Sequence, residues 1–204
     1  MGRGRPRKTD PDMVLEEAMK LFWKQGFSGT SMSDLVAATG MVKPGLYSNF
    51  GDKEALYKLA LERYIRDFGA AWLEELIHSP KPVSVCFRQF LEAAASMLVD
   101  KSNPEGCFLV NCLTEGTVQP AEIVSLSQTF VAKRRTAFAL RFERAEQQGD
   151  LLPGSDTEAL ADFFSGQILS LGVLCRAGAN ITVLHRVIDV AMMALPPIPT
   201  AAQG

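Results

Sequence analysis

The sequence lacks the residue patterns that mark most enzymes and metal proteins. It contains no GxSxG, HExxH or phosphate-binding P-loop motif, and those spacings position the nucleophiles, metal ligands and glycine turns of their classes. Its two histidines are too few for most metal sites, and its four cysteines (Cys86, Cys107, Cys112 and Cys175) show no CxxC spacing. We therefore expect no enzymatic activity, no metal and no cofactor, and we expect reduced thiols rather than a disulfide framework.

Long uninterrupted apolar runs are also missing. We find no apolar stretch of membrane-spanning length, and no apolar run follows the basic N-terminus as it would in a signal peptide. At 204 residues, 47% hydrophobic and 22% charged, the chain is nevertheless long and apolar enough to bury a core. These features predict a cytoplasmic protein with no membrane partner.

Charge is unevenly distributed along the chain. Residues 1–66 contain 11 Lys/Arg and 8 Asp/Glu, a balance of +3, whereas the remainder contains 10 and 15, a balance of −5. Residues 1–9 are expected to form a flexible basic arm, which carries Arg3, Arg5, Arg7 and Lys8. A basic head on an acidic body favours contact of the head alone with a polyanion, although a solvated N-terminal tail would have the same composition.

The beginning of the chain shows the start and stop signals of four helices. Asp10 and the proline after it combine an N-cap with a first-position proline. Residues 31–34 read SMSD, a capping-box pattern, and Gly40 ends the second helix after about two turns. A third helix is expected over residues 43–50, and Asp52 caps a fourth.

Two short helices joined by a tight turn at Gly40 are typical of a helix-turn-helix, whose second helix enters the DNA major groove. If Leu46 and Phe50 face inward, the other side of that helix presents groups that can contact phosphates or base edges, with a glycine that lets the backbone approach closely. These exposed positions are Lys43, Gly45, Tyr47, Ser48 and Asn49. The alternative is a small helical bundle without a ligand.

In order along residues 10–57, the chain reads LFWKQGF, then GTSMSDLVAATGM, then LYSNFGDKEAL. This ordered set at the N-terminus of a chain of this length resembles the TetR-type transcriptional regulators. The resemblance implies an all-α dimer. Its N-terminal three- or four-helix head, residues 10–57, would bind DNA through the helix-turn-helix, and the larger helical domain would bind a small molecule and the partner subunit.

The resemblance also assigns roles to residues of the head. Lys43 and Pro44 would face bases, and Tyr47 would meet a phosphate. Lys53 would meet another phosphate at a helix N-terminus, where free backbone N–H groups also point. Many members have Ser or Thr where Val42 stands and His where Asn49 stands, which leaves the base sequence open. The candidate DNA-binding residues are Thr30, Ser31, Ser33, Lys43, Pro44, Gly45, Tyr47, Ser48, Asn49 and Lys53.

Residues 58–196 read as further helices, which the resemblance assigns to ligand binding and dimerisation. Apolar spacing and end signals predict helices over residues 82–101, after Asn103-Pro104, over about 120–148, over 155–176 from a capping box at Ser155, and over about 182–195. Residues 197–204 are expected to be a disordered tail.

The last two predicted helices are too apolar to have an ordinary solvent face. Such helices form either a buried core or a subunit interface, which resembles a core cut in half. We favour the dimer interface, where glycine and serine would let helices approach closely. The candidate dimerisation residues are Leu160, Phe163, Gly166, Leu169, Ser170, Val173, Val187, Val190 and Ala191.

A ligand cavity between the helices of the body would be lined by apolar and aromatic side chains. Any of these residues could instead be ordinary core. Arg134 could pair with an acidic ligand, although a surface ion pair is the alternative for it and for Arg135. The candidate ligand-binding residues are Phe87, Phe90, Leu91, Met97, Cys107, Phe130, Arg134, Phe138 and Phe164.

Cys107 stands out among the thiols. If Asn103 caps a helix, Cys107 lies at the end of its first turn, where partial positive charge favours a thiolate. The Gly-Cys pair resembles a TetR subgroup in which some members sense reactive compounds through a cysteine. A free cysteine is otherwise a small buried hydrophobe.

Together these patterns predict a dimeric repressor that binds a near-palindromic double-stranded DNA operator and is released by an unidentified small-molecule inducer. Three alternatives stay open: a thiol-based electrophile or redox sensor that uses Cys107, a thiol-dependent enzyme, and a helical adaptor whose head has lost DNA binding.

Overall fold

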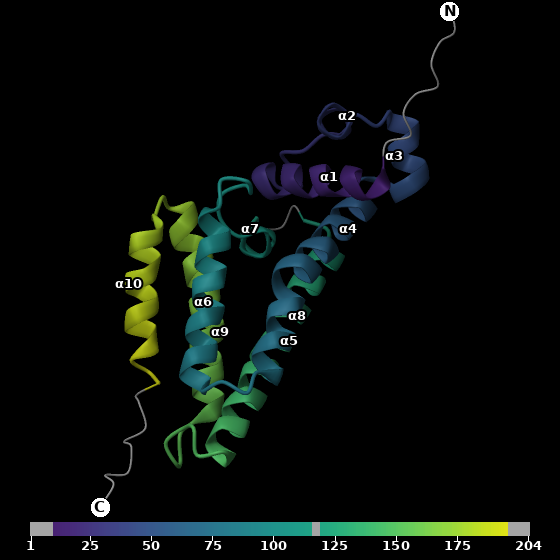
Figure 1. Cartoon of the computed structure of the whole chain (residues 1–204). Helices are drawn as coiled ribbons and strands as arrows, with labels where there is room; N and C mark the ends of the chain where they lie inside the picture. The colour runs from purple at the N-terminus through teal and green to yellow at the C-terminus, as the bar shows by residue number, and fades with distance from the viewer. Residues whose placement is uncertain (1–9, 116–118, 196–204) are drawn as a thin grey trace, which may run out of the picture.

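The computed structural model describes residues 10–115 and 119–195, and all regular structure within these ranges is helical (Figure 1). The predicted all-α class is therefore confirmed. The expected basic arm (residues 1–9) and the expected tail (residues 197–204) lie outside the described residues.

The head begins with three helices whose ends follow the sequence signals. They are α1 (Pro11–Gln25), α2 (Met32–Thr39) and α3 (Lys43–Phe50). The Asp10 side chain accepts from the Asp12 N–H, and Ser31 and Asp34 make both halves of a capping box. Gly40 ends α2 with φ 67°, a left-handed conformation that glycine adopts without a Cβ penalty.

A nearly continuous helical rod leads from the head along the body (Figure 1). It consists of α4 (Lys53–Ile65), a π-helical turn η1 (Arg66–Ala70) and α5 (Ala71–His78). The predicted domain boundary at residues 57 and 58 falls inside α4, so one helix crosses it. Neither η1 nor α5 was predicted. At Gly69 a Cβ would lie 2.5 Å from the Phe130 ring, so a larger residue would force the two segments apart.

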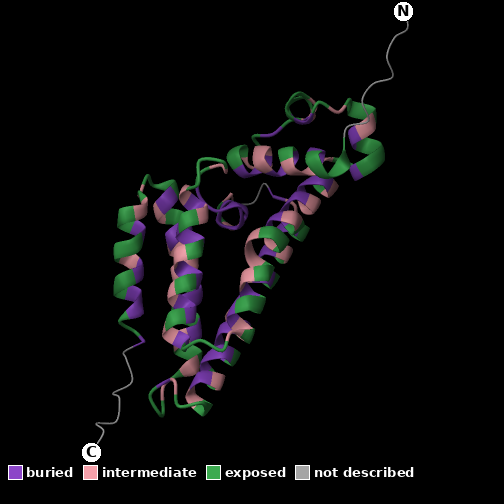
Figure 2. Cartoon of the chain, in the orientation of Figure 1, coloured by how far each residue is buried: buried purple, intermediate pink, exposed green. Residues whose placement is uncertain are grey.

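The rest of the body is built from α6 (Val83–Val99), α7 (Phe108–Thr114), α8 (Ala121–Gln147), α9 (Thr157–Arg176) and α10 (Ile181–Met192). Helix α9 packs against α8 and α6, and α10 packs against α6 and α9. Figure 2 shows α10 buried along the side that faces α6 and exposed along its outer side.

Two predicted helix starts in the body are wrong. Asn103 and Pro104 lie in a loop, and α7 begins only at Phe108 with Cys107 as its N-cap residue. At α9 the cap is Asp156, which accepts from the Ala159 N–H at 2.9 Å, whereas the Ser155 hydroxyl donates to the Leu152 carbonyl. At α9 the residue after the predicted cap is the observed cap, whereas at α7 no side chain caps the helix.

Helix α9 also corrects the expectation about apolar runs. It has 20 residues and a mean hydropathy of 1.3 over its most apolar window, which is long and apolar enough to cross a membrane by length and composition. A core helix of a soluble protein meets the same criterion, and α9 packs against four other helices of the chain, α6, α7, α8 and α10.

Candidate functional sites

Helix α3 presents a polar face to solvent. Leu46 is fully buried and Phe50 is 9% exposed, as the sequence predicted, and they fix the orientation of the helix. The opposite face carries the exposed residues Lys43, Pro44, Tyr47, Ser48 and Asn49, with Gly45 partly buried. The Ser48 hydroxyl and the Asn49 amide donate to the Gly45 carbonyl at 3.1 and 2.7 Å, so both polar groups lie along the surface of the helix.

The turn before α3 packs closely against the helix. A Cβ on Gly45 would lie 2.9 Å from Cγ of Met41, so any larger residue would push that side chain aside. Val42 makes no side-chain cap, as expected for an apolar residue at that place. The first N–H groups of α3 are therefore free of a side-chain cap, and Val42 itself is 68% exposed.

Three of the candidate DNA contacts have hydrogen-bond partners within the head. Thr30 is only 1% exposed and its hydroxyl donates to the Gly26 carbonyl at 2.8 Å, so its side chain does not reach the surface. The Lys53 ammonium donates to the carbonyls of Phe27 and Thr30, each at 3.0 Å, instead of projecting from the start of α4. The Ser31 hydroxyl bonds Asp34, while Ser33 is exposed.

In addition to the continuous helix α4, residues 23–28 of the head make hydrogen bonds with the body, and none of these bonds was predicted. Trp23 is fully buried, and its indole N–H donates to the Gly106 carbonyl at 3.1 Å. The Asn111 amide donates back to the Trp23 carbonyl at 2.9 Å. The Glu115 carboxylate accepts from the backbone N–H groups of Phe27 at 3.1 Å and residue 28 at 3.0 Å. Displacing either side therefore breaks hydrogen bonds to the other.

A small cavity of about 40 Å³ lies at the centre of the body, bounded by α4, η1, α5, α6, α8, α9 and the start of α7. Five candidate ligand-binding residues border it: Phe90, Met97, Cys107, Phe130 and Arg134. Its other lining residues are Tyr64, Ile65, Phe68, Gly69, Trp72, Ala94, Leu98, Leu109 and Ile168. Tyr64, Phe68 and Trp72 recur every four residues, a helical aromatic stripe that the sequence analysis missed.

Four other candidate ligand-binding residues are core instead. Phe87, Phe138 and Phe164 are fully buried, Leu91 is 1% exposed, and none of the four borders the cavity. Phe87 stacks on Phe142 with ring centroids 4.2 Å apart and meets Phe138 edge-on at 5.0 Å. These aromatic contacts hold α6 to α8, which is why the same helical spacing that predicted pocket residues also selected packing residues.

Cys107 borders the cavity but is not open to approach from solvent. It is 8% exposed, and its sulfur lies 3.2 Å from the Tyr64 hydroxyl. Burial raises the pKa of Tyr64, and the neighbouring thiol adds to that shift. A Cβ on Gly172 would lie 2.8 Å from the Cβ of Cys107, so this glycine serves packing between α9 and the start of α7.

Cys112 is buried one turn further along, 3.3 Å from the Tyr57 hydroxyl. Burial raises the pKa of the Cys112 thiol to about 12, so the thiol stays neutral near pH 7. Burial likewise raises the pKa of Tyr57.

Arg134 and Arg135 lie side by side in α8 but have opposite environments. Arg135 forms a surface ion pair with Asp162 at 2.7 Å and a second one with Glu158. This agrees with the surface ion pair given as the alternative for it in the sequence. Arg134 is 3% exposed, so the surface ion pair suggested for it is wrong. Its Nη2 donates to the Ser165 carbonyl at 3.2 Å, and its Nε has no hydrogen-bond partner among the described residues. Burial lowers the pKa of Arg134 to about 10, which still leaves it charged at pH 7.

The outer sides of α9 and α10 expose apolar side chains. On α9, Phe163 is 40% and Val173 is 51% exposed, with Gly166 exposed and Ser170 partly buried between them. On α10, Val190 is 68% exposed. Leu160, Leu169 and Val187 are partly buried against the core. Ala191 is 3% exposed and faces the interior of the chain, which removes it from the candidate interface.

The described residues contain no group of three or more His, Cys, Asp or Glu side chains that could hold a metal ion. The four cysteines are buried and free.

Comparison with known proteins matches both regions of the chain. Residues 14–60 match the family described as bacterial regulatory proteins, tetR family, and residues 87–191 match the tetracyclin repressor-like C-terminal domain. The HTH-type transcriptional repressor ComR of Escherichia coli (strain K12) is 32% identical over 197 residues, which cover 96% of this chain and 93% of ComR.

Solved structures show the same arrangement. A cysteine mutant of the TetR family transcriptional regulator CifR, complexed with 26-bp double-strand operator DNA, has a TM-score of 0.81 at 27% identity and covers 95% of this chain and 100% of CifR. AibR in complex with isovaleryl coenzyme A and operator DNA has a TM-score of 0.70 at 22% identity over 91% of this chain and 97% of AibR, a likeness of fold alone.

Proposed function

The chain belongs to the TetR family of bacterial regulatory proteins, and we propose from this premise that it is a transcriptional repressor that leaves its operator when a small molecule enters the body. The observation that carries the proposal is the exposed polar face of α3, held by buried Leu46 and Phe50 directly after the capped helix α2. A helix so presented fits the major groove. We infer that the protein acts in the cytoplasm and is not an enzyme.

We propose that DNA is contacted by the exposed part of the head. Lys43 and Pro44 at the start of α3 would face base edges. Gly45, which has no side chain, would let the backbone of α3 approach the DNA closely. The hydroxyl of Tyr47, which is 45% exposed, would meet a phosphate. Ser31, Ser33, Ser48 and Asn49 complete the proposed contact surface. Thr30 and Lys53 act instead as supports that hold the turn before α2 to α4.

We further propose that two subunits associate through the exposed apolar side of α9 and α10. Phe163, Gly166, Ser170 and Val173 recur at helical spacing along α9, and Val190 continues this surface on α10. The exposed surface would be supported on its inner side by three partly buried residues, Leu160, Leu169 and Val187. Two heads joined in this way would read a near-palindrome whose half-sites are about one helical turn apart.

A selection from a random duplex pool tests the DNA-binding proposal directly. We expect the purified protein to enrich one near-palindromic sequence, with affinity that falls steeply as salt is raised. Lys43→Ala should weaken binding of the selected duplex by about 1–3 kcal/mol per head while leaving scrambled duplexes less affected. Lys81→Ala is the matched control, because that exposed lysine lies far from the head in the loop before α6.

Two results would contradict the proposal. One is a pool that shows no enrichment and no salt-dependent binding, which would leave a helical adaptor as the better interpretation. The other is equal weakening by the Lys43 and Lys81 substitutions, since a specific contact surface on α3 requires them to differ.

A second candidate, a repressor released by thiol modification, is favoured by one observation: Cys107 borders the cavity, with its sulfur 3.2 Å from a tyrosine hydroxyl. Treatment with N-ethylmaleimide should then release the wild type and the Cys112→Ser variant from DNA after one equivalent, but not Cys107→Ser. Release of all three, or of none, would dismiss this mechanism. Repeated turnover of a peroxide would instead indicate a thiol-dependent enzyme.

A further inference from the structure

The cavity in the body is bordered by one buried charge that no described residue neutralises. The Arg134 side chain borders the cavity and is 3% exposed. No carboxylate lies within ion-pair distance of it among the described residues, and its Nε has no hydrogen-bond partner there. A buried charge without a partner is strongly destabilising, and an anion placed beside it removes that penalty.

Two other arginines of α8 differ from Arg134 in what surrounds them. Arg135 points to the surface, where Asp162 and Glu158 pair with it. Arg141 is also buried without an acidic partner among the described residues, and its Nε and Nη1 have no hydrogen-bond partner there, but its Nη2 donates to the Lys81 carbonyl at 2.7 Å and it borders no part of this cavity. Among these three arginines, Arg134 alone combines a charge that lacks a described acidic partner with a position on the wall of this cavity.

The remaining wall of the cavity is mainly apolar. Phe68, Trp72, Phe90 and Phe130 enclose it with aromatic rings, and the Tyr64 hydroxyl and the Cys107 thiol are the polar groups beside the guanidinium. A ligand suited to this lining carries one negative charge at one end and an apolar body at the other. A guanidinium favours a carboxylate at that end, because its planar set of donors matches the two oxygens.

We propose that the inducer is an organic monocarboxylate, whose carboxylate pairs with Arg134 and whose apolar chain lies among the aromatic residues. This assignment rests on the proposed function, because it identifies the ligand class of the same cavity. The proposed ligand would account for the buried charge of Arg134, which has no acidic partner among the described residues and which packing alone does not explain.

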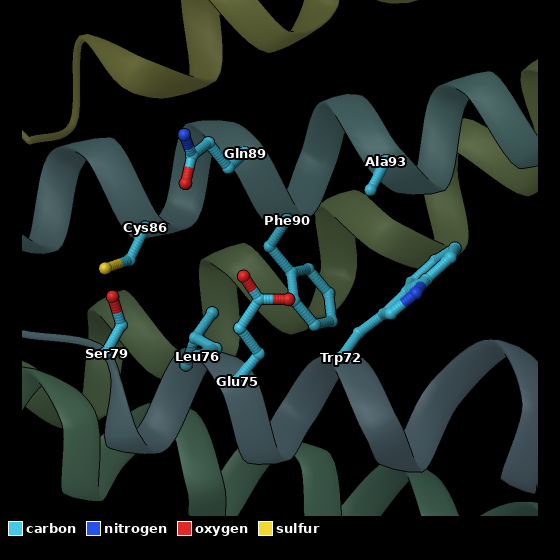
Figure 3. A pocket seen from close by; sticks show the side chains of 8 residues that line it. All are labelled: Trp72, Glu75, Leu76, Ser79, Cys86, Gln89, Phe90 and Ala93. Carbon is cyan, nitrogen blue, oxygen red and sulfur yellow. The ribbon is translucent and has the colours of Figure 1, made fainter. Parts of the chain in front are cut away.

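The size of the cavity limits how much of the ligand's apolar chain it can enclose. At about 40 Å³ the cavity accommodates little more than a polar head group. An open groove of about 110 Å³ between α5 and α6 shares two of its walls, Trp72 and Phe90 (Figure 3). These two rings meet edge-on with centroids 6.3 Å apart. A ligand chain longer than the cavity would reach the groove by moving these two rings apart.

The groove also disfavours a second negative charge. Glu75 of α5 lies in it between Leu76 and Phe90, as Figure 3 shows. A carboxylate at the far end of the ligand would meet this like charge, whereas a methyl end would not. The structure therefore distinguishes monocarboxylates from dicarboxylates of equal length.

Calorimetric titration of the protein without DNA tests the assignment. Octanoate, 1-octanol and octanedioate differ only in their end groups, and we expect octanoate to bind most tightly. Arg134→Met keeps an unbranched apolar stem but removes the charged guanidinium, and it should weaken octanoate binding about 10- to 100-fold while leaving 1-octanol binding unchanged. Arg135→Gln should bind octanoate as the wild type does.

The outcomes separate this assignment from the proposed function. If 1-octanol binds the wild type as tightly as octanoate, or if none of the three binds, the carboxylate assignment is overturned whether or not the protein binds DNA. Undiminished octanoate binding by Arg134→Met overturns it as well. Should that variant not fold, the comparison of acid and alcohol on the wild type decides alone. Failure of the DNA selection with octanoate binding intact would instead overturn the repressor proposal.

Discussion

The exposed face of α3 and the cavity around Arg134 are built in opposite ways. The α3 face consists of polar residues from eight consecutive positions of one helix, and two buried residues of the same helix orient it. The cavity draws its lining from seven elements spread over residues 64–168, and its one charged residue is nearly inaccessible. A surface that meets a large polyanion can be local and solvated, whereas a site that encloses a small molecule requires convergence of distant segments.

Between these two regions, the head contacts the body at residues 23–28, and helix α4 continues from one into the other. On the side of the head, Trp23 and the turn after α1 take part. On the side of the body, Gly106, Asn111 and Glu115 surround the start and end of α7. Cys107, which borders the cavity, lies directly between Gly106 and α7. A ligand that shifts the start of α7 would therefore act on the position of α1.

Removing Trp23 should have the largest effect, because the residue belongs to both regions at once. It is fully buried and donates to the Gly106 carbonyl, so Trp23→Ala leaves a large cavity and an unpaired carbonyl. We expect the free energy of unfolding to fall by about 3–5 kcal/mol, measured by urea denaturation followed by circular dichroism. Trp72→Ala is the control, because removal of that partly exposed ring should lower the free energy of unfolding by less. Equal losses in the two variants would mean that Trp23 does not join the regions.

Glu115→Ala should weaken the same connection without emptying the core. The carboxylate accepts from two backbone N–H groups of the head, and their loss is expected to cost about 1–3 kcal/mol of stability. The more informative result is that an inducer should release DNA less completely, although Lys43 and α3 are untouched. Electrophoretic titration of the operator complex with and without octanoate would measure this release.

A matched acidic residue provides the control for that experiment. Glu122 pairs with Lys58 at the surface, where an ion pair contributes little, so Glu122→Ala should leave both stability and release close to those of the wild type. If Glu115→Ala responds to ligand as fully as Glu122→Ala does, the connection between cavity and head runs through other residues.

The contrast between the two regions also explains what the sequence could predict. In the head, Asp10, Ser31, Gly40 and Asp52 are local signals, since each cap bonds a backbone group within a few residues, and the helix ends that they predicted are confirmed. The inward orientation of Leu46 followed from spacing alone. The Lys53 ammonium points to carbonyls of the turn before α2 and not towards the DNA side of α4. This could not be predicted, because its two partners lie 23 and 26 residues earlier in the chain.

In the body, spacing identifies which residues are buried but not what they surround. Phe87 and Phe90 are three residues apart on one helix, yet the first packs against Phe142 while the second borders the cavity. Arg134 and Arg135 are adjacent and equally plausible ligand contacts in the sequence, and only the packing of α9 decides that Asp162 meets the second one. Burial of a charge is a tertiary property, so no window of sequence contains it.

The contact between Tyr57 and Cys112 beneath the head should make stability depend on alkaline pH. In the unfolded chain the thiol ionises near pH 9, whereas burial raises its folded pKa to about 12. Above pH 9 the unfolded state therefore binds fewer protons than the folded state, and stability, complete below that pH, falls by about 1.4 kcal/mol per pH unit towards pH 12. Urea unfolding between pH 8 and 10, below the range in which the unfolded-state tyrosines ionise, would measure the slope. Cys112→Ala should flatten it, and an unchanged slope would show that other groups govern alkaline unfolding.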